Sequence, residues 1–371
     1  MSRHYLDHAS TSPLRPEARD AMVAALDLVG DPSRIHQEGL AVRVAVEQAR
    51  EQVAATFGAR PREVVFTGSG TEAIATAVTG VTSRGSHQVL TAVEHSAVRL
   101  PAERTGRMSV VAVDGQGRVD PERVVAAIRP ETAVVHVQAG NHEVGTRQPV
   151  AEVVAACADH DVLVHVDAAQ ANGHDPVAFA EMGADLVTLS AHKFGGPAGV
   201  GALLIRRGLR LDPLLVGGDQ ERARRAGLEN LTAVAGFAAA CAALDDGRLT
   251  AEADRARRLT DRVRAGVAEL DGIPIYGDPV DRLPHLVCLG IEGVEPQAVL
   301  LGLDAAGIAV HSGSACSSEA LEPSPVLEAM GVDAHRSLRV SVGWSTTDTD
   351  VDAFLDLLPR VVSDLRALGA G

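Results

Sequence analysis

Aromatic residues are scarce in this 371-residue chain: tryptophan, tyrosine and phenylalanine together make up 2% of it. Proteins that bind single-stranded nucleic acid commonly stack bases on aromatic side chains, so this composition disfavours that function. Basic residues are outnumbered, with 34 Lys plus Arg against 49 Asp plus Glu and a formal net charge of −15. An acidic chain repels nucleic acid and anionic lipid, and we expect neither as a partner.

Long apolar runs are missing as well. None approaches the length needed to cross a bilayer, and we therefore expect no membrane association. The first residues, MSRHYLDHASTSP, contain no apolar signal core, which favours a cytoplasmic location.

Cysteine occurs four times and never as a Cys-x-x-Cys pair, so the sequence shows no zinc pattern and we expect no metal site. Cys157, Cys241 and Cys288 lie in apolar stretches, which is typical of small buried residues with free thiols. Cys316 differs, because it lies in the polar, Gly/Ser-rich segment SGSACSSE. An exposed thiolate there can act as a nucleophile, although a tolerated surface cysteine is the alternative interpretation.

Lysine is the rarest of the charged residues. Lys193 is the single lysine among 34 basic residues, and the other 33 are arginines. An ammonium group can lose its proton and attack a carbonyl, whereas a guanidinium stays protonated. The retained lysine therefore indicates amine chemistry, with a chance surface lysine as the alternative.

Short apolar segments alternate with amphipathic stretches through the first two thirds of the chain. Seven segments have the pattern of buried strands: REVVFTG, QVLTAVE, MSVVAVD, TAVVHVQ, VLVHVDA, DLVTLSA and GALLIRR. The alternation predicts an α/β domain with a mainly parallel sheet and helices on both faces. After a long helical stretch near residue 250 the pattern becomes α+β. We predict a large domain over residues 16–250 and a small domain from residues 1–15 and 251–371.

Polar residues follow two of the predicted strands. Asp167 ends VLVHVDA, and Lys193 comes 26 positions later, just after DLVTLSA. Ligands of open α/β sheets bind at the carboxyl ends of the strands, so both side chains can reach one crevice. Pyridoxal phosphate (PLP) requires such a pair, a lysine for its aldehyde and an acid for its ring nitrogen. A helix N-cap is the alternative interpretation of Asp167.

A phosphate site is predicted at TGSGTEA, where a strand leads into a helix through Gly70 and Thr71. Backbone N–H groups at a Gly-rich helix N-terminus bind phosphate, although an ordinary capped helix fits the same letters. Ser190 and His192 can add further donors.

Two more residues have two interpretations each. His95 follows the strand of QVLTAVE and can stack on a planar cofactor or move protons, or it can be structural. Arg339 lies inside the apolar segment SLRVSVG, where it can clamp a substrate carboxylate or form a structural salt bridge.

Taken together, these segments resemble the cysteine desulfurases of the NifS/IscS type, which are class V aminotransferases of PLP fold type I. The resemblance runs nearly end to end, through YLDHASTSPLRPEA, GDPSRIHQEG, VVFTGSGTEA, VEHSAV, NHEVGTRQP, HVDAAQ, SAHKFGGPAGVGAL, GGDQERARRAGLEN, SGSACSSEALEPSPVL and SLRVSVG. It implies an L-cysteine desulfurase that forms a persulfide on Cys316, releases L-alanine and passes the sulfur to an acceptor protein. It also implies a homodimer.

The resemblance assigns roles to matching positions. Lys193, His95 and Cys316 would be catalytic, with Lys193 carrying PLP as a Schiff base and His95 stacking on the ring. The implied cofactor contacts are Gly70, Thr71, His95, Asp167, Gln170, Ser190, His192 and Lys193. Among them Asp167 would pair with the ring nitrogen, Gln170 with the ring hydroxyl, and Thr71, Ser190 and His192 with the phosphate. Arg339 and Asn141 would bind the substrate.

Three positions depart from the family pattern. His142 stands where an asparagine normally touches the cofactor ring, Ala75 replaces another asparagine, and Leu228 replaces a threonine that contacts the partner subunit's phosphate. The changes keep open a related PLP enzyme with another substrate, such as a selenocysteine lyase, a cysteine lyase or an aminotransferase. A non-catalytic partner protein that kept the fold is a further alternative, disfavoured because Lys193, Asp167 and Cys316 are all present.

Overall fold

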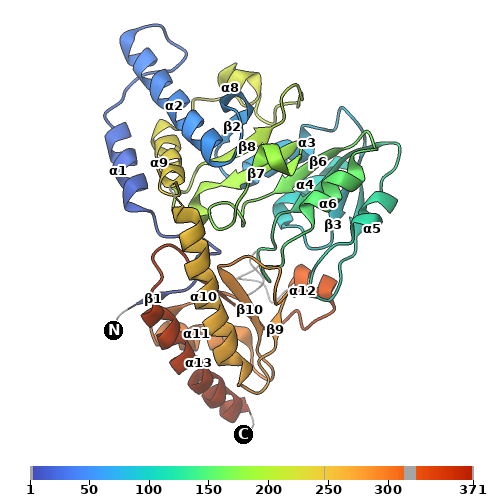
Figure 1. Ribbon diagram of the computed structural model, residues 1–371, viewed down its shortest axis with the longest axis vertical. Helices are drawn as coiled ribbons and strands as arrows, with labels where there is room; N and C mark the ends of the chain where they lie inside the picture. The colour runs from blue at the N-terminus through green and yellow to red at the C-terminus, as the bar shows by residue number, and fades with distance from the viewer. Residues whose placement is uncertain (1–2, 246, 313–322, 370–371) are drawn as a thin grey trace.

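The computed structural model describes residues 3–245, 247–312 and 323–369 (Figure 1). Within these ranges a seven-stranded sheet has the order β2-β8-β7-β6-β5-β3-β4. Its strands are β2 (Val64–Thr67), β3 (His87–Thr91), β4 (Arg107–Val111), β5 (Thr132–Gln138), β6 (Leu163–Asp167), β7 (Leu186–Ser190) and β8 (Gly201–Ile205). Each segment predicted as a strand forms one of them, and the predicted α/β fold with a mainly parallel sheet is confirmed.

Strand β8 is antiparallel to both of its neighbours, β7 and β2. A parallel connection needs a crossover of a dozen or more residues, and the residues between Ser190 and Gly201 are too few for one. They form instead a short loop that contains the 3-10 turn Ala191–Lys193. The reversal therefore holds Lys193 at the carboxyl end of β7.

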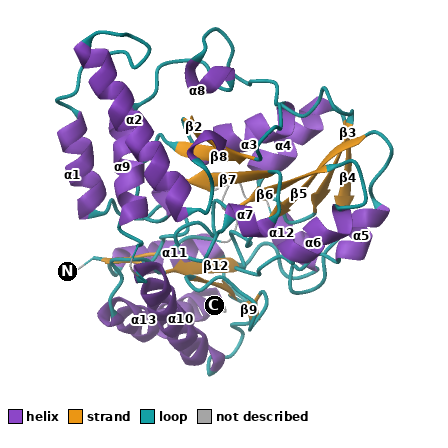
Figure 2. Ribbon diagram, turned by 45° about the horizontal axis from the view of Figure 1, so that its top comes forward, coloured by secondary structure: helices purple, strands orange, loops and turns teal. Residues whose placement is uncertain are grey.

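Helices cover both faces of this sheet, as Figure 2 shows. One face packs against α2 (Gln37–Thr56), α6 (Val150–Cys157) and α9 (Leu231–Ala242), which share one apolar cluster with alternate strand residues. The other face packs against α3 (Gly70–Thr79), and α3 in turn packs against α4 (Ser96–Thr105). Side chains of a strand point alternately to its two faces, which explains why strands buried on both sides are continuous apolar runs.

A second apolar cluster lies in the later part of the chain and includes Leu6 from the N-terminal segment. It packs α10 (Arg248–Ala268), α11 (Pro296–Ala305) and α13 (Asp348–Gly369) against a sheet of order β12-β10-β9. Its strands are β9 (Ile275–Tyr276), β10 (Leu286–Gly290) and β12 (Ser337–Ser341), and β1 (His4–Tyr5) pairs with β11 (Ile308–Ala309) nearby. The N-terminal segment thus contacts the second core before α1 (Pro16–Ala25) packs on α9.

The long helical stretch predicted near residue 250 is two helices, α9 and α10. Gly247, at the N-cap of α10, has φ 81°, a left-handed conformation that favours glycine and ends helical continuity. The remaining helices are short: α5 (Pro121–Ala126), α7 (Phe179–Met182), α8 (Gln220–Ala223) and α12 (Pro325–Met330). Of the helices in the described ranges, none combines the length and the apolar character that crossing a bilayer requires.

Candidate active site

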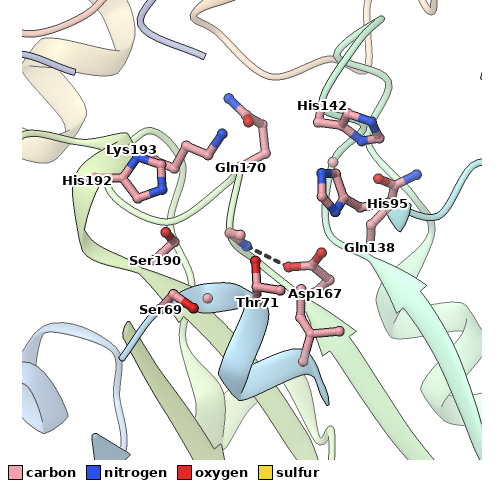
Figure 3. A pocket seen from close by; sticks show the side chains of 14 residues that line it. Ser69, Thr71, His95, Gln138, His142, Asp167, Gln170, Ser190, His192 and Lys193 are labelled. Carbon is pink, nitrogen blue, oxygen red and sulfur yellow. Dashed lines mark hydrogen bonds between the residues drawn. The ribbon is translucent and has the colours of Figure 1, made fainter. Parts of the chain in front are cut away.

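A cavity of about 240 Å³ opens at the carboxyl edge of the large sheet (Figure 3). Strands β5, β6 and β7 are neighbours and end in Gln138, Asp167 and Ser190, so their last residues lie side by side. The lining consists of Ser69, Gly70, Thr71, Ile74, His95, Gln138, Gly140, His142, Asp167, Ala169, Gln170, Ser190, His192 and Lys193. Every residue predicted to contact a cofactor therefore lines this one cavity.

One end of the cavity is formed by the start of helix α3. Ser69 caps the helix by accepting a hydrogen bond from the backbone N–H of Glu72, so the capped-helix interpretation of this motif also holds. At Gly70 a Cβ atom would lie 3.1 Å from the Ser190 Cβ and 3.3 Å from its Oγ. The missing side chain leaves room for an anion between the helix terminus and the Ser190 hydroxyl, where helix N–H groups favour negative charge.

Asp167 is buried at the end of β6. Its Oδ1 accepts a hydrogen bond from the backbone N–H of Ala169 at 3.0 Å. Burial raises the pKa of Asp167 to about 6, and the Ala169 hydrogen bond and the Lys193 charge act against that rise. A buried carboxylate of this kind is stabilised by a cationic partner, such as a protonated ring nitrogen.

Lys193 faces the same cavity from the loop after β7. Figure 3 shows its amine extending toward Gln170. The Nζ donates a hydrogen bond to the Ala9 carbonyl at 2.6 Å, so the N-terminal segment reaches the site. Ser12 holds this loop, because its N–H donates to the His192 carbonyl and its hydroxyl to the Lys193 carbonyl, both at 2.8 Å.

Two histidine rings lie opposite Lys193 (Figure 3). The rings of His95 and His142 meet edge to face, with centroids 4.9 Å apart and an interplanar angle of 76°. Burial is the main cause that lowers the pKa of each to about 3, with neighbouring positive charge adding to it. Both rings are therefore neutral at pH 7, and together they form an uncharged side of the cavity.

Sequence reasoning missed several lining residues. Ser69, Ile74, Gln138, Gly140 and Ala169 were not predicted, and His142 was noted only as a departure from the family pattern. Gln138 carried a usable signal, since it is the polar last residue of a buried strand, as Asp167 is. Gly140 and Ala169 carried no such signal, because a small residue contributes to a cavity only by leaving space.

The structure places the two predicted substrate residues outside the cavity lining. The guanidinium of Arg339 donates to the His142 carbonyl at 2.8 Å and to the Ser10 hydroxyl at 2.8 Å, and forms an ion pair with Asp7 at 3.2 Å. The Asn141 side chain is fully buried, and its Oδ1 accepts hydrogen bonds from the backbone N–H groups of Glu143 and Val144. Their substrate-binding roles stay predictions. The predicted nucleophile, Cys316, lies outside the described residues.

The other two departures from the family pattern also lie outside the lining. Ala75 is half-buried on α3, and its neighbour Ile74 lines the cavity instead. Leu228 is 59% exposed. Cys157, Cys241 and Cys288 are buried free cysteines, as predicted from their apolar surroundings.

An amine, a buried carboxyl group and a helix terminus open to an anion share one crevice at the edge of an α/β sheet. This combination fits PLP, and it defines a PLP-dependent enzyme of the α/β class. The chain belongs to the aminotransferase class-V family, whose sequence profile matches residues 4–354.

Known proteins of this family resemble the chain along nearly its whole length. The cysteine desulfurase IscS of Dictyoglomus turgidum is 39% identical over 98% of this chain and 95% of its own. A solved structure described as a NifS-like protein superposes with a TM-score of 0.91 at 30% identity, covering 98% of this chain and all of its own. Another, described as SspA in complex with cysteine, has a TM-score of 0.79 at 26% identity, covering 93% of this chain and 100% of its own.

Proposed function

We propose that this chain is a PLP-dependent L-cysteine desulfurase. Curated relatives that match the whole chain are named cysteine desulfurases. The observation that carries the proposal is the shared cavity of Lys193 and Asp167, since the lone lysine of the chain and a buried carboxyl group meet where the cofactor would lie. The cysteine-bound structure similar to this chain supports cysteine as the substrate.

Residues that line the cavity would contact the phosphate, the ring and the aldehyde of the cofactor. The N-terminus of α3, with Gly70, Thr71, Ser190 and His192, would bind the phosphate. Burial lowers the pKa of His192 to about 4, so its neutral ring retains one N–H to donate. Asp167 would pair with the ring nitrogen, and Gln170 with the ring hydroxyl. His95, which lines the cavity beside His142, would stack on the ring. Lys193 would bond covalently to the aldehyde carbon.

When bound, PLP withdraws electrons from the bonds at the substrate's α-carbon. Asp167 supports this by keeping the ring nitrogen protonated from a buried position. The amine of Lys193, when it is not bonded to the cofactor, would take up and return the α-proton of the substrate. The neutral ring of His95 can accept or donate a proton on the opposite side of the cavity.

Sulfur transfer is assigned to Cys316. Its thiolate attacks the sulfur of the substrate, a new S–S bond forms, and the substrate Cβ–S bond breaks. The electron pair of the broken bond is taken up with protons on the carbon skeleton, so that the net reaction is enzyme thiol plus L-cysteine to enzyme persulfide plus L-alanine. The persulfide sulfur then passes to an acceptor protein.

A homodimer is part of the proposal. Exposed apolar side chains lie on the α1–α2 connection and on the segment between β8 and α9, including Val29, Ile35, Val216 and Leu228. The two segments are neighbours, because residues 31–33 and 219–221 line one surface cavity. Exposed apolar side chains on neighbouring segments are typical of an interface, and a second copy of the chain would cover them. A thiol as the sulfur carrier suits a reducing compartment, so we place the enzyme in the cytoplasm.

The function is tested by incubating the purified, PLP-loaded chain with L-cysteine and measuring sulfide and alanine. We expect stoichiometric alanine, and a mass increase of ~32 Da on the Cys316 peptide, one sulfur atom. Cys316→Ala should abolish sulfide release, and Lys193→Arg should lower turnover on the order of 10³-fold or more.

Cys157→Ala is the matched control, because Cys157 is a buried thiol outside the cavity lining, and it should keep full activity. Full sulfide release by Cys316→Ala would contradict the persulfide step. A wild-type chain that binds PLP but turns over another amino acid in preference to cysteine would favour the related PLP enzymes instead.

A further inference from the structure

Three buried histidines lie behind the cavity, outside its lining. His8 comes from the N-terminal segment, His174 from the turn after β6, and His285 from the residue before β10. The rings of His174 and His285 are stacked, with centroids 3.7 Å apart and an interplanar angle of 10°. The proposed catalysis does not use them, yet each is hydrogen-bonded to a segment that carries cavity residues or supports them.

The stack connects two cavity residues. His174 Nε2 is 3.0 Å from the Lys193 carbonyl oxygen and can only donate to it, which fixes its tautomer. His285 Nε2 is 2.8 Å from Gln170 Nε2. His8 supports the same loop through Ser12, because its Nδ1 is 2.9 Å from the Ser12 hydroxyl, which in turn donates to the Lys193 carbonyl.

The contact between Gln170 and His285 joins two nitrogens, so one of them must accept. With the amide as placed, its NH₂ donates to His285 Nε2, and His285 then carries its proton on Nδ1. Within the described part of the chain, Gln170 Oε1 and His285 Nδ1 both lack a hydrogen-bond partner and are buried. This arrangement leaves a buried N–H donor without an acceptor, which is rare in proteins.

Turning the Gln170 amide over resolves the conflict. Amide oxygen and nitrogen are assigned from their hydrogen bonds rather than from their positions. In the turned arrangement His285 Nε2–H donates to the amide oxygen, and His285 Nδ1 keeps only a lone pair. The amide NH₂ then takes the position of the partnerless oxygen, on a side chain that lines the cavity, and can donate from there.

We propose that His285 is a positioning residue that, by donating to Gln170, turns the Gln170 NH₂ toward the ring hydroxyl oxygen of PLP. The inference rests on the proposed function, because it needs PLP in the cavity. His174 is hydrogen-bonded to the Lys193 carbonyl and stacks on the His285 ring, so its contacts fix the plane of that ring relative to the lysine loop.

Burial, with positive charge nearby, keeps His285 in the neutral form that this role needs. Burial lowers the pKa of His285 well below its ordinary value, and the nearby His174, His8, Arg339 and Lys193 lower it further. A neutral imidazole has one N–H, and Gln170 is its only described partner, so that N–H goes to the amide oxygen.

The inference has a spectroscopic consequence. A hydrogen bond donated to the ring oxygen stabilises its negative charge, so the proton beside it on the cofactor-bound lysine nitrogen is held less tightly. Losing that hydrogen bond should raise the pH at which the visible absorption band of bound PLP changes. One hydrogen bond to a charged oxygen corresponds to about one pH unit.

The test is a pH titration of the visible band in the PLP-loaded enzyme without substrate. His285→Leu removes the donor and should raise the midpoint by about one pH unit, as should Gln170→Ala. His285→Gln keeps an N–H near the position of Nε2 and should restore the wild-type midpoint. The double variant His285→Leu with Gln170→Ala should show no further shift, because both changes remove one hydrogen-bonded chain.

The visible band itself reports a folded, loaded enzyme in each variant, and His335→Leu, on the exposed surface, is the matched control. An unchanged midpoint in His285→Leu, or additive shifts in the double variant, would overturn the positioning role. An unchanged midpoint in Gln170→Ala would overturn the contact of Gln170 with the ring oxygen. A wild-type chain that shows no band after loading would contradict the proposed function instead.

Discussion

At the residue scale, the site depends on polar side chains that are buried away from water. Asp167 is 7% exposed and has one described hydrogen bond, from Ala169. Burying a carboxylate costs free energy unless a cation or donors compensate, and this cost is what raises its pKa to about 6. A protonated ring nitrogen beside the Asp167 carboxylate would offset this cost, so the buried carboxylate should attract it strongly.

Replacing Asp167 by Asn should separate cofactor binding from catalysis. The amide has the same shape but carries no charge, so the ring nitrogen loses its proton and the ring withdraws electrons less well. We expect turnover of L-cysteine to fall by about 10²–10⁴-fold, with PLP still bound through the phosphate contacts. Steady-state alanine production and PLP absorbance measure the two effects. Asp161→Asn, at a fully exposed loop acid, is the control, and an equal loss there would contradict a specific role.

At the element scale, a chain of polar side chains crosses the middle of the large sheet. His136 on β5 and His165 on β6 are paired in register, with their Nδ1 atoms 2.9 Å apart. The chain continues from His136 to Gln88 on β3 and from His165 to Thr188 on β7, at 2.8 Å each. Each of these side chains is buried and hydrogen-bonded to the next. The chain therefore favours one register of the strands and leaves none of these buried polar groups without a partner.

The buried histidines predict a loss of stability in acid. Burial lowers the pKa of His165 to about 3 and that of His136 well below 6.5. The unfolded chain therefore binds protons more tightly than the folded chain. The stabilisation is complete above about pH 6.5 and is lost as the pH falls toward 3, at about 1.4 kcal/mol per pH unit for each histidine.

Urea unfolding between pH 7.5 and 5.5 measures this slope. His165→Gln should reduce the slope of the unfolding free energy against pH by the contribution of one histidine. His335→Gln, at an exposed site, should leave the slope unchanged. A slope that stays the same in His165→Gln would show that this ring is not kept neutral by the fold.

At the scale of the whole molecule, two apolar cores meet at the site. The N-terminal segment joins the second core through Leu6 and reaches Lys193 through Ala9 and Ser12. His285 likewise precedes a strand of the second core and contacts Gln170, which lies on the large sheet's edge. The division into domains at residues 15 and 250 stays a prediction. The contacts of the N-terminal segment and of His285 show that residues next to the second core touch residues of the cavity in the large sheet.

Charge placed on the proposed dimer surface should separate the subunits. Ile35 and Val216 are 89% and 77% exposed, and a carboxylate at either would be desolvated in a dimer. Light scattering should give twice the chain mass of 38.5 kDa for the wild type and a single chain for Ile35→Asp with Val216→Asp. Val280→Asp, equally exposed elsewhere, should remain dimeric. A wild type that runs as a single chain would contradict the dimer.

Much of the fold and cavity follows from local patterns. Every strand of the large sheet lies in a segment that its apolar residues predicted as a strand, and a parallel sheet brings the ends of such segments to one edge. Asp167, Ser190 and Lys193 could therefore be placed together from sequence, as could the helix N-terminus at Gly70. Residues whose role is empty space, such as Gly140, could not, because absence of a side chain leaves no pattern.

The sequence by itself determined the strand set, the cofactor and the residues predicted to contact it, which line one cavity, because strand period and strand-end chemistry are local properties. Tertiary structure alone decided which polar groups are already engaged: Arg339 is paired with Asp7, and Asn141 holds its own turn. It also decided that Gln170 meets His285, 115 positions away. Such contacts arise when distant segments pack together, and neither periodicity nor spacing encodes them.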